Sequence, residues 1–219
     1  QMRTDIEDGR YSDWDDPRLP TLAGLRKRGI QASALRSFWN ELGITQKDIS
    51  VPLATLYSHN TKAVDDEAPR LTFVRHAVEF QLTGDHPHQL SIPVHPNHAS
   101  MGLRGWKLND GRIWLEGEDL EKMDLRLKEF ADVALHDQEA RVESIERSDK
   151  RPIVHWLPAS QSVNAVVLST KDDTIVHTEG QLERHKHKAG TIVQLERVGY
   201  AIVIDNTTLM LCHEESREQ

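Results

Sequence analysis

Apolar residues recur at helical spacing through the first third of the chain. Between residues 32 and 42 they form the stripe of a half-buried helix that Gly43 closes, at Ala34, Leu35, Phe38, Trp39 and Leu42. A shorter helix is predicted over residues 21–28, ended by Gly29, because glycine tolerates a left-handed C-terminal cap. A third helix is predicted after a Ser50 cap, with Pro52 in its first turn, and its stripe runs to Val64.

From Arg70 onward the period of the apolar pattern changes to two, which is typical of strands with one buried face. Turn residues such as Gly, Asn and Asp separate these segments, and one helical turn is expected near residues 117–123. Many short strands of this kind indicate antiparallel sandwiches or barrels. The predicted strands cover residues 71–73, 78–82, 90–94, 112–115, 126–130, 133–136, 141–145, 153–156, 165–168, 191–195, 200–204 and 208–213.

The composition is that of an ordinary soluble globular protein, with 219 residues of which 37% are hydrophobic and 28% charged. This length allows one large domain or two to three small ones. The apolar runs are too short to span a bilayer, and no secretion signal opens the chain. The lone Cys212 excludes an intrachain disulfide and fits a reducing compartment. We therefore expect a cytoplasmic protein.

The overall charge does not by itself suggest a nucleic-acid partner. The 27 Lys and Arg residues are outnumbered by 35 Asp and Glu residues, which gives a formal charge of −8, whereas many nucleic-acid binders are basic. At ~0.15 M salt a charge acts over only about 8 Å, so local clusters matter more than the total. Basic clusters occur at residues 26–28, 150–151 and 184–188, and each taken alone is more often a solvated surface.

Five motifs occur in order along the chain: WDDPRLPTLAGLRKRGI (Trp14–Ile30), APRLTFV (Ala68–Val74), HPNHASMGLR (His95–Arg104), IVHWLP (Ile153–Pro158) and VQLERVGY (Val193–Tyr200). This series resembles the C-terminal half of glutamyl- and glutaminyl-tRNA synthetases of the archaeal and eukaryotic kind. The resemblance runs from about Trp14 to the end of the chain. In that family this half holds the anticodon end of a tRNA and does not form the aminoacyl bond.

The resemblance implies a mixed, mainly β fold. A small helical connector over residues 1–67 is followed by two antiparallel β-barrels, which are similar to the barrels of ribosomal 5S-rRNA-binding proteins. We expect the proximal barrel at residues 68–93 and 181–219. The distal barrel is expected at residues 94–180, as an insertion.

The ATP site of the family needs an HIGH-type signature and a KMSKS-type loop, and the sequence contains neither. It also lacks a glycine-rich phosphate loop. In the family WDDPR follows shortly after the KMSKS-type loop, and the chain begins with Gln1 rather than Met. We therefore expect a piece of a glutamate–tRNA ligase, a class I aminoacyl-tRNA synthetase, with no catalytic residue and no cofactor of its own. This piece should be inactive alone, since ATP and magnesium belong to the parent enzyme.

The resemblance assigns three residues to the middle anticodon base: Arg70 in APRLTFV, and Gln194 and Arg197 in VQLERVGY. Glutamate and glutamine tRNAs both carry U at this position. RNA recognition favours unstacked loop bases, and a guanidinium suits them because it makes two parallel hydrogen bonds and also stacks. Without the motifs, Arg70 would be an exposed residue at a strand start. Arg197 would be an ion-pair partner of Glu196 or Glu183.

The remaining candidate contacts lie in two motifs. Arg104, in HPNHASMGLR, corresponds to the family's arginine that contacts the third anticodon base, which is G in glutamine tRNAs and C in glutamate tRNAs. Trp106 is either a platform for a base, worth ~1–3 kcal/mol, or an aromatic residue of the barrel rim. Trp156 is predicted to lie in the core. The cluster Arg26, Lys27 and Arg28 is either a contact to tRNA phosphates or a solvated face.

Histidine pairs with metal-ligand spacing lie on irregular, Pro- or Lys-rich stretches of a chain with a single cysteine, so we predict no metal site. These pairs are His86/His88, His95/His98 and His185/His187.

The expected partner is glutamate tRNA, with glutamine tRNA left open, and we expect a monomer with no membrane or DNA partner. The form V-R-x-x-V-E-F (Val74–Phe80) is nearer to archaeal glutamyl enzymes, and GYAIVIDN (Gly199–Asn206) lacks a cysteine that often follows this turn in glutaminyl enzymes. Three alternatives remain. They are the same region of a glutaminyl-tRNA synthetase, a stand-alone β-barrel RNA-binding protein, and an interaction module of a multi-synthetase assembly.

Overall fold

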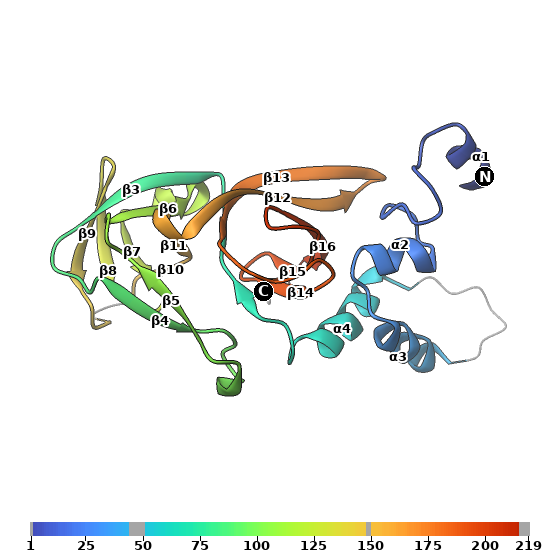
Figure 1. The fold of residues 1–219 in the computed structure, drawn as a ribbon, viewed down its shortest axis with the longest axis horizontal. Coiled ribbons are helices and arrows are strands. Elements are labelled where there is room, and N and C mark those ends of the chain that lie inside the picture. Colours follow the sequence, from blue (N-terminus) through green and yellow to red (C-terminus); the bar gives the residue numbers. More distant parts are fainter. Residues whose placement is uncertain (1, 44–50, 148–149, 215–219) are drawn as a thin grey trace. The chain divides into compact units, whose positions relative to one another are not determined.

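Four helices precede the strands in the computed structural model, which describes residues 2–43, 51–147 and 150–214 (Figure 1). They are α1 (Met2–Glu7), α2 (Leu22–Lys27), α3 (Ala32–Leu42) and α4 (Leu53–Val64). The last three confirm the predicted helices. The apolar pattern does not predict α1, because none of its residues is buried. The predicted Ser50 cap lies outside the described residues, and Pro52 occupies the N-cap position of α4.

Glycines end α2 and α3, as predicted. Gly29 has a φ of +90° and Gly43 a φ of +68°, the region that favours a residue without a side chain. Gly29 is also closely packed, since a Cβ atom added there would lie 2.5 Å from the Cys212 Sγ atom and 2.9 Å from the Ile192 Cδ1 atom. This position therefore joins the end of α2 to the strands of the same unit.

The strands follow α4, and short 3-10 turns interrupt them. The turn η2 (Gly117–Glu121) confirms the helical turn expected near residues 117–123, and the other two are η1 (Ala99–Met101) and η3 (Ala159–Gln161). The strands are β1 (Arg70–Leu71), β2 (Phe73–Arg75), β3 (Ala77–Thr83), β4 (Gln89–Pro93), β5 (Leu103–Lys107), β6 (Arg112–Glu116), β7 (Asp124–Leu127), β8 (Asp132–His136), β9 (Glu139–Ser144), β10 (Ile153–Val154), β11 (Trp156–Pro158), β12 (Ser162–Lys171), β13 (Thr174–Glu183), β14 (Ile192–Leu195), β15 (Gly199–Val203) and β16 (Thr208–Glu214).

The chain divides into two compact units. The first unit comprises residues 1–68, 167–177 and 187–219, and the second unit comprises residues 69–166 and 178–186. The long strands β12 and β13 contribute residues to both units. The mainly β fold with few helices and two barrel-like, seven-stranded sheets confirms the predicted fold class. The division into a connector, a proximal barrel and a distal barrel stays a prediction.

The helices of the first unit pack on strands that come much later in the sequence. In its sheet β14, β15, β16, β12 and β13 are neighbours in that order, and β14 and β15 are antiparallel. Apolar residues of the helices and of the late strands form one buried cluster, which removes apolar surface from water. The buried members of this cluster are Leu25, Ile30, Leu56, Val64, Ala68, Tyr200 and Cys212.

The turn between β12 and β13 is tied to the N-terminal segment of the same unit. Asp172 and Asp173 have φ values of +44° and +67°, as a two-residue hairpin turn of type I′ requires. The Asp173 carboxylate accepts hydrogen bonds from the Arg10 guanidinium, at 2.5 Å from Nη2, and from the Tyr11 hydroxyl at 2.6 Å. This clamp joins residues more than 160 positions apart in the chain.

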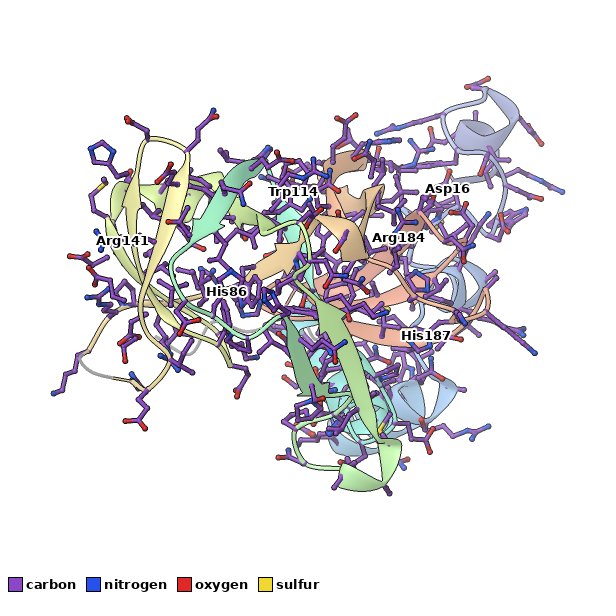
Figure 2. All side chains as sticks on the ribbon, turned by 60° about the vertical axis from the view of Figure 1, so that its left-hand side comes forward. Asp16, His86, Trp114, Arg141, Arg184 and His187 are labelled. Atoms are coloured by element: carbon purple, nitrogen blue, oxygen red, sulfur yellow. The ribbon has the colours of Figure 1, made fainter. Side chains whose placement is uncertain are left out.

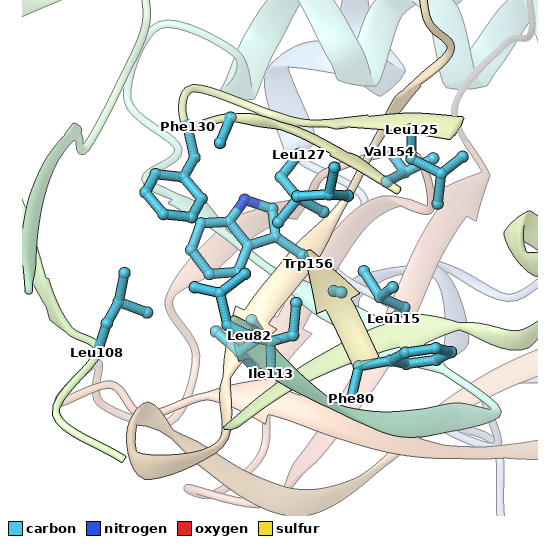
Figure 3. Close-up of a cluster of buried hydrophobic side chains, with 14 of the residues drawn as sticks. Phe80, Leu82, Leu108, Ile113, Leu115, Leu125, Leu127, Phe130, Val154 and Trp156 are labelled. Atoms are coloured by element: carbon cyan, nitrogen blue, oxygen red, sulfur yellow. The ribbon is translucent and has the colours of Figure 1, made fainter. Parts of the chain in front are cut away.

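The second unit is built on a seven-stranded sheet in the order β10-β7-β8-β9-β3-β6-β11. Most described pairs in this sheet are antiparallel, while β3 with β9 and β10 with β7 are parallel. Trp156 lies in the middle of the core and is 1% exposed, which confirms its predicted role (Figure 3). Its ring stacks on Phe130, with ring centroids 4.9 Å apart, and Trp106 meets it edge to face at 5.2 Å.

The hydrophobic pattern does not predict two of the described strands, β5 and β13. β13 has polar or partly exposed residues on both faces along most of its length, so it lacks the alternation that marks a half-buried strand. β5 has a single buried residue, Trp106, flanked by Gly105 and Lys107. The predicted strand at residues 165–168 is part of the longer β12, and the one at residues 126–130 ends earlier, with β7 at Leu127.

Candidate nucleic-acid interface

Arg70 and Arg104, two of the predicted base-contacting residues, are brought together in the second unit. Arg70 opens β1, and it is only 6% exposed. Its backbone N–H donates to the Val94 carbonyl at 2.8 Å, and its own carbonyl accepts from the Arg104 Nη1 atom at 2.8 Å. The Arg70 main chain is therefore held on both sides, and one of these contacts comes from the second predicted residue.

A buried carboxylate, Glu183, lies at the centre of this arrangement. It belongs to the end of β13 and is 5% exposed. Its Oε2 atom accepts from Arg104 Nη1 at 2.5 Å and from the Thr72 backbone N–H at 3.2 Å, and its Oε1 atom accepts from Trp106 Nε1 at 2.8 Å. The Glu183 backbone N–H also donates to the Thr72 carbonyl at 2.9 Å. We call Arg104, Trp106, Glu183 and the backbone of residues 70–72 the Glu183 cluster.

Trp106 is part of the interior of the second unit. Its side chain is 4% exposed, its indole N–H is used by Glu183, and its ring meets Trp156 edge to face. The Arg104 guanidinium lies 5.7 Å from the centroid of the Trp106 ring, within the range of a cation–π interaction. A base platform needs an open ring face, so this burial favours a structural role for Trp106.

Gln194 and Arg197 lie together in the first unit. Gln194 is half-buried in β14 opposite Tyr200 of β15, and Arg197 is exposed in the turn that joins these two strands. Arg197 has a φ of +64°, a conformation that is uncommon for a residue with a side chain. The Val198 N–H donates to the Leu195 carbonyl at 3.0 Å and closes the turn. The turn thus presents a guanidinium from a fixed backbone.

The three basic residues at the end of α2 occupy different environments. Arg26 and Lys27 are exposed, and the Lys27 Nζ atom lies 2.9 Å from an Asp15 carboxylate oxygen. Arg28 is buried, with an exposed fraction of 9%. Its Nη2 atom donates to the Tyr57 hydroxyl at 2.8 Å and to the Cys212 carbonyl at 3.2 Å. Only the first two present their charge to solvent.

The acidic part of the WDDPR motif has a structural role. Asp16, labelled in Figure 2, is 1% exposed, and its carboxylate accepts from the Ser12 N–H at 2.9 Å and from the Arg18 guanidinium at 2.7–2.9 Å. The side-chain hydrogen bonds from Arg18 hold the pKa of Asp16 well below its ordinary value. The motif therefore fixes the segment that leads into α2.

Histidines add an aromatic cluster to the first unit. The ring of His213 stacks on Tyr57, with ring centroids 5.2 Å apart, and lies tilted on Tyr200 at 5.4 Å. Burial lowers the pKa of His213 below 6.5, because desolvation disfavours its charged form. Burial also lowers the pKa of His187, which Figure 2 labels.

Within residues 2–43, 51–147 and 150–214, no group of three or more His, Cys, Asp or Glu side chains could hold a metal ion.

No helix in the described part of the chain is long and apolar enough to cross a membrane.

The sequence patterns miss Glu183 as a member of this site. A glutamate at the end of a polar strand carries no signal of its own, and the pairing with Arg104 joins residues 79 positions apart. The preceding Leu182 is fully buried as well. Successive residues of a strand point to opposite faces, so the end of β13 is covered on both faces. That coverage is a structural feature that no local pattern reveals.

Comparisons with known proteins agree with the motifs. Residues 68–151 match a family model described as tRNA synthetases class I (E and Q), anti-codon binding domain, and residues 153–204 match a second model with the same description. Similar curated proteins are named glutamate–tRNA ligase. One from Methanosarcina acetivorans is 35% identical over 91% of this chain and 36% of its own length. Another, from Natronomonas pharaonis, is 35% identical over 90% of this chain and 35% of its own length.

A third glutamate–tRNA ligase, from Archaeoglobus fulgidus, is 32% identical over 92% of this chain and 36% of its own length. The chain thus spans a little over a third of the length of the relatives that it matches.

Proposed function

Because the chain belongs to the family of anticodon-binding domains of class I tRNA synthetases for E and Q, we propose that it holds the anticodon loop of glutamate tRNA within a glutamate–tRNA ligase. The observation that carries the proposal is the match of two adjacent anticodon-binding models to more than half of the chain. The names of the archaeal relatives favour the glutamyl enzyme over the glutaminyl one.

Within this proposal, Arg70, Gln194 and Arg197 are each assigned to the middle anticodon base. Arg70 is only 6% exposed, so it offers at most one hydrogen-bonding edge of its guanidinium. The exposed guanidinium of Arg197, in a closed turn, supports its part in this role, since an unstacked base is recognised by planar donors on a rigid support. Arg104 is assigned to the third anticodon base or to the support of Arg70. Trp106 belongs to the support, because its ring is buried.

The phosphates are contacted by Arg26 and Lys27, whose exposed positive charges suit an interaction that tolerates any base sequence. Arg28 serves as a core residue that holds α2 in place.

We assign ATP, magnesium and the ligation reaction to parts of the enzyme outside the matched region. The described residues offer no group of three or more His, Cys, Asp or Glu side chains for a metal ion. The partner in this proposal is glutamate tRNA, with glutamine tRNA left open, and the enzyme acts as a monomer in the cytoplasm.

A binding experiment tests the proposal. The chain should bind glutamate tRNA in a filter-binding assay and release it as salt rises, because phosphate contacts supply much of the affinity. A tRNA with a changed middle anticodon base should bind more weakly. Arg197→Ala should remove ~1–3 kcal/mol of that difference, the range of a good base contact.

The control for this experiment is Arg36→Ala, which removes an exposed arginine of α3 from the same unit. It should leave the difference between the two tRNAs unchanged. Equal binding of both tRNAs by the unaltered chain would refute the proposal.

A further inference from the structure

We propose that Glu183 is a positioning residue for anticodon recognition, an inference that rests on the proposed function. Glu183 would contact no base. It would hold Arg104 and the main chain of residues 70–72 in the geometry from which Arg70 meets the middle base.

The first argument is the number of separate segments that one carboxylate joins. Glu183 lies in β13, and it accepts hydrogen bonds from Arg104 and Trp106 in β5 and from Thr72 between β1 and β2. These three donors come from two segments about 80 and 110 residues away in the chain. A single side chain therefore fixes the relative positions of three strands at the place where Arg70 begins β1.

The second argument concerns Arg104. Its Nη1 atom lies 2.5 Å from Glu183 Oε2 and 2.8 Å from the Arg70 carbonyl, so one nitrogen is shared between the carboxylate and the main chain of Arg70. A guanidinium is planar and rigid, and two fixed acceptors therefore determine its orientation. Glu183 thus acts on Arg70 through Arg104.

The third argument is energetic. Taking a carboxylate and a guanidinium out of water is costly unless their hydrogen bonds are satisfied in good geometry. The side chains of Glu183 and Arg104 are only 6% and 12% exposed, so their contacts must be kept for the charges to remain buried. The burial therefore disfavours arrangements that break these contacts, which suits a support for base recognition.

A comparable pair in the same unit serves as a matched control. Glu116 is 2% exposed, and it accepts from the Arg75 guanidinium at 2.7 Å from Nε and 2.5 Å from Nη2. This pair has the same chemistry and similar burial as Glu183 with Arg104. Its carboxylate pairs with Arg75 rather than with Arg104, so it measures what the loss of a buried, paired carboxylate does to stability.

The experiment compares Glu183→Gln with Glu116→Gln. Glutamine keeps the size of the side chain. Its amide nitrogen, however, donates hydrogen bonds, so it would face an N–H donor whose hydrogen bond the carboxylate oxygen accepts. The ratio of the Kd values for the tRNA with a changed middle base and for unaltered glutamate tRNA is measured, together with Tm. We expect Glu183→Gln to lower this ratio about ten-fold, as the loss of one hydrogen bond to a charged group would. Glu116→Gln should lower Tm and leave the ratio unchanged.

The outcomes separate this inference from the proposed function. If the unaltered chain does not distinguish the two tRNAs, the proposed function fails. If it does distinguish them and Glu183→Gln keeps the full ratio, the positioning role is refuted. An equal loss of the ratio in both glutamine variants would also refute it, because the effect would then be general destabilisation.

A second variant covers the case in which Glu183→Gln does not fold. Arg104→Lys keeps the positive charge beside Glu183 but replaces the rigid, planar guanidinium, whose Nη1 atom meets both Glu183 and the Arg70 carbonyl, by a shorter and flexible ammonium group. It should retain most of the Tm and lower the Kd ratio several-fold. A folded Arg104→Lys variant with an unchanged ratio overturns the inference.

Discussion

Replacing Arg28 with alanine should destabilise the first unit without weakening its contacts with RNA phosphates, whereas replacing Arg26 should do the reverse. The two residues are two positions apart in one basic cluster, yet Arg28 is buried and Arg26 is exposed. Comparing the two variants therefore tests whether burial, rather than the mere presence of a basic residue in the cluster, decides which side chain contacts the RNA.

The size of the Arg28 effect follows from its contacts. Its Nη2 atom donates to the Tyr57 hydroxyl and the Cys212 carbonyl, and the guanidinium lies 5.7 Å from the centroid of the Tyr57 ring. A hydrogen bond to a charged group contributes ~1.5–3 kcal/mol, and part of the loss is offset because the guanidinium no longer has to be desolvated. We expect Arg28→Ala to lower the free energy of unfolding by ~2–4 kcal/mol. Arg26→Ala should change it by less than ~0.5 kcal/mol, as is usual for an exposed residue.

Two measurements separate these effects. Urea unfolding followed by circular dichroism gives the free energy of unfolding, and filter binding of glutamate tRNA at several salt concentrations gives the salt dependence of the affinity. Arg26→Ala should reduce the slope of log K against log salt concentration by ~1, the effect of one lost phosphate contact. Arg28→Ala, assayed where it is folded, should leave the slope unchanged. A reduced slope for Arg28→Ala with unaltered stability would show that its burial does not govern its role.

Two further predictions concern the same unit. Gly29→Ala should lower the free energy of unfolding by ~2 kcal/mol or more, because the new methyl group meets the Cys212 Sγ atom at 2.5 Å and φ is +90°. Gly9→Ala is the control, since its φ is +78° but nothing lies within 4 Å of the added atom, so a similar loss there would contradict the packing argument. The free energy of unfolding should also fall as the pH drops below 6.5, because burial lowers the pKa of His213 and the unfolded chain then binds more protons. His213→Phe should flatten this dependence in urea titrations between pH 8 and pH 5, and an identical pH dependence in the variant would refute the assignment.

The sequence predicts the elements whose local pattern matches their surroundings. The helix α3 has the predicted bounds, and within its stripe Leu35 and Phe38 pack on one core, whereas Trp39 is 62% exposed. Gly29 and Gly43 end their helices because positive φ is a local requirement that glycine meets. By contrast, β13 is polar on both faces along most of its length and is held by its neighbours, so its own residues do not predict a strand.

The candidate site can be predicted only in part from the sequence. The motifs identify Arg70, Arg104 and Arg197 as residues of interest, but they do not predict which guanidinium is exposed. Arg104 is paired with a carboxylate 79 positions away, and Arg197 is exposed because a tight turn carries it. Burial and long-range pairing depend on the tertiary structure. The order of residue types along one chain therefore does not predict them.

The core that joins the helices to the late strands has a consequence during synthesis. Val64 at the end of α4 and Ile192 at the start of β14 belong to one apolar cluster, and they are 128 positions apart. At ~5–20 residues per second, a ribosome needs roughly 6–26 s to add that length. During this interval the nascent helices leave the exit tunnel before the late strands that cover part of their apolar surface have been made. They are therefore the segment of this chain that chaperones should occupy first.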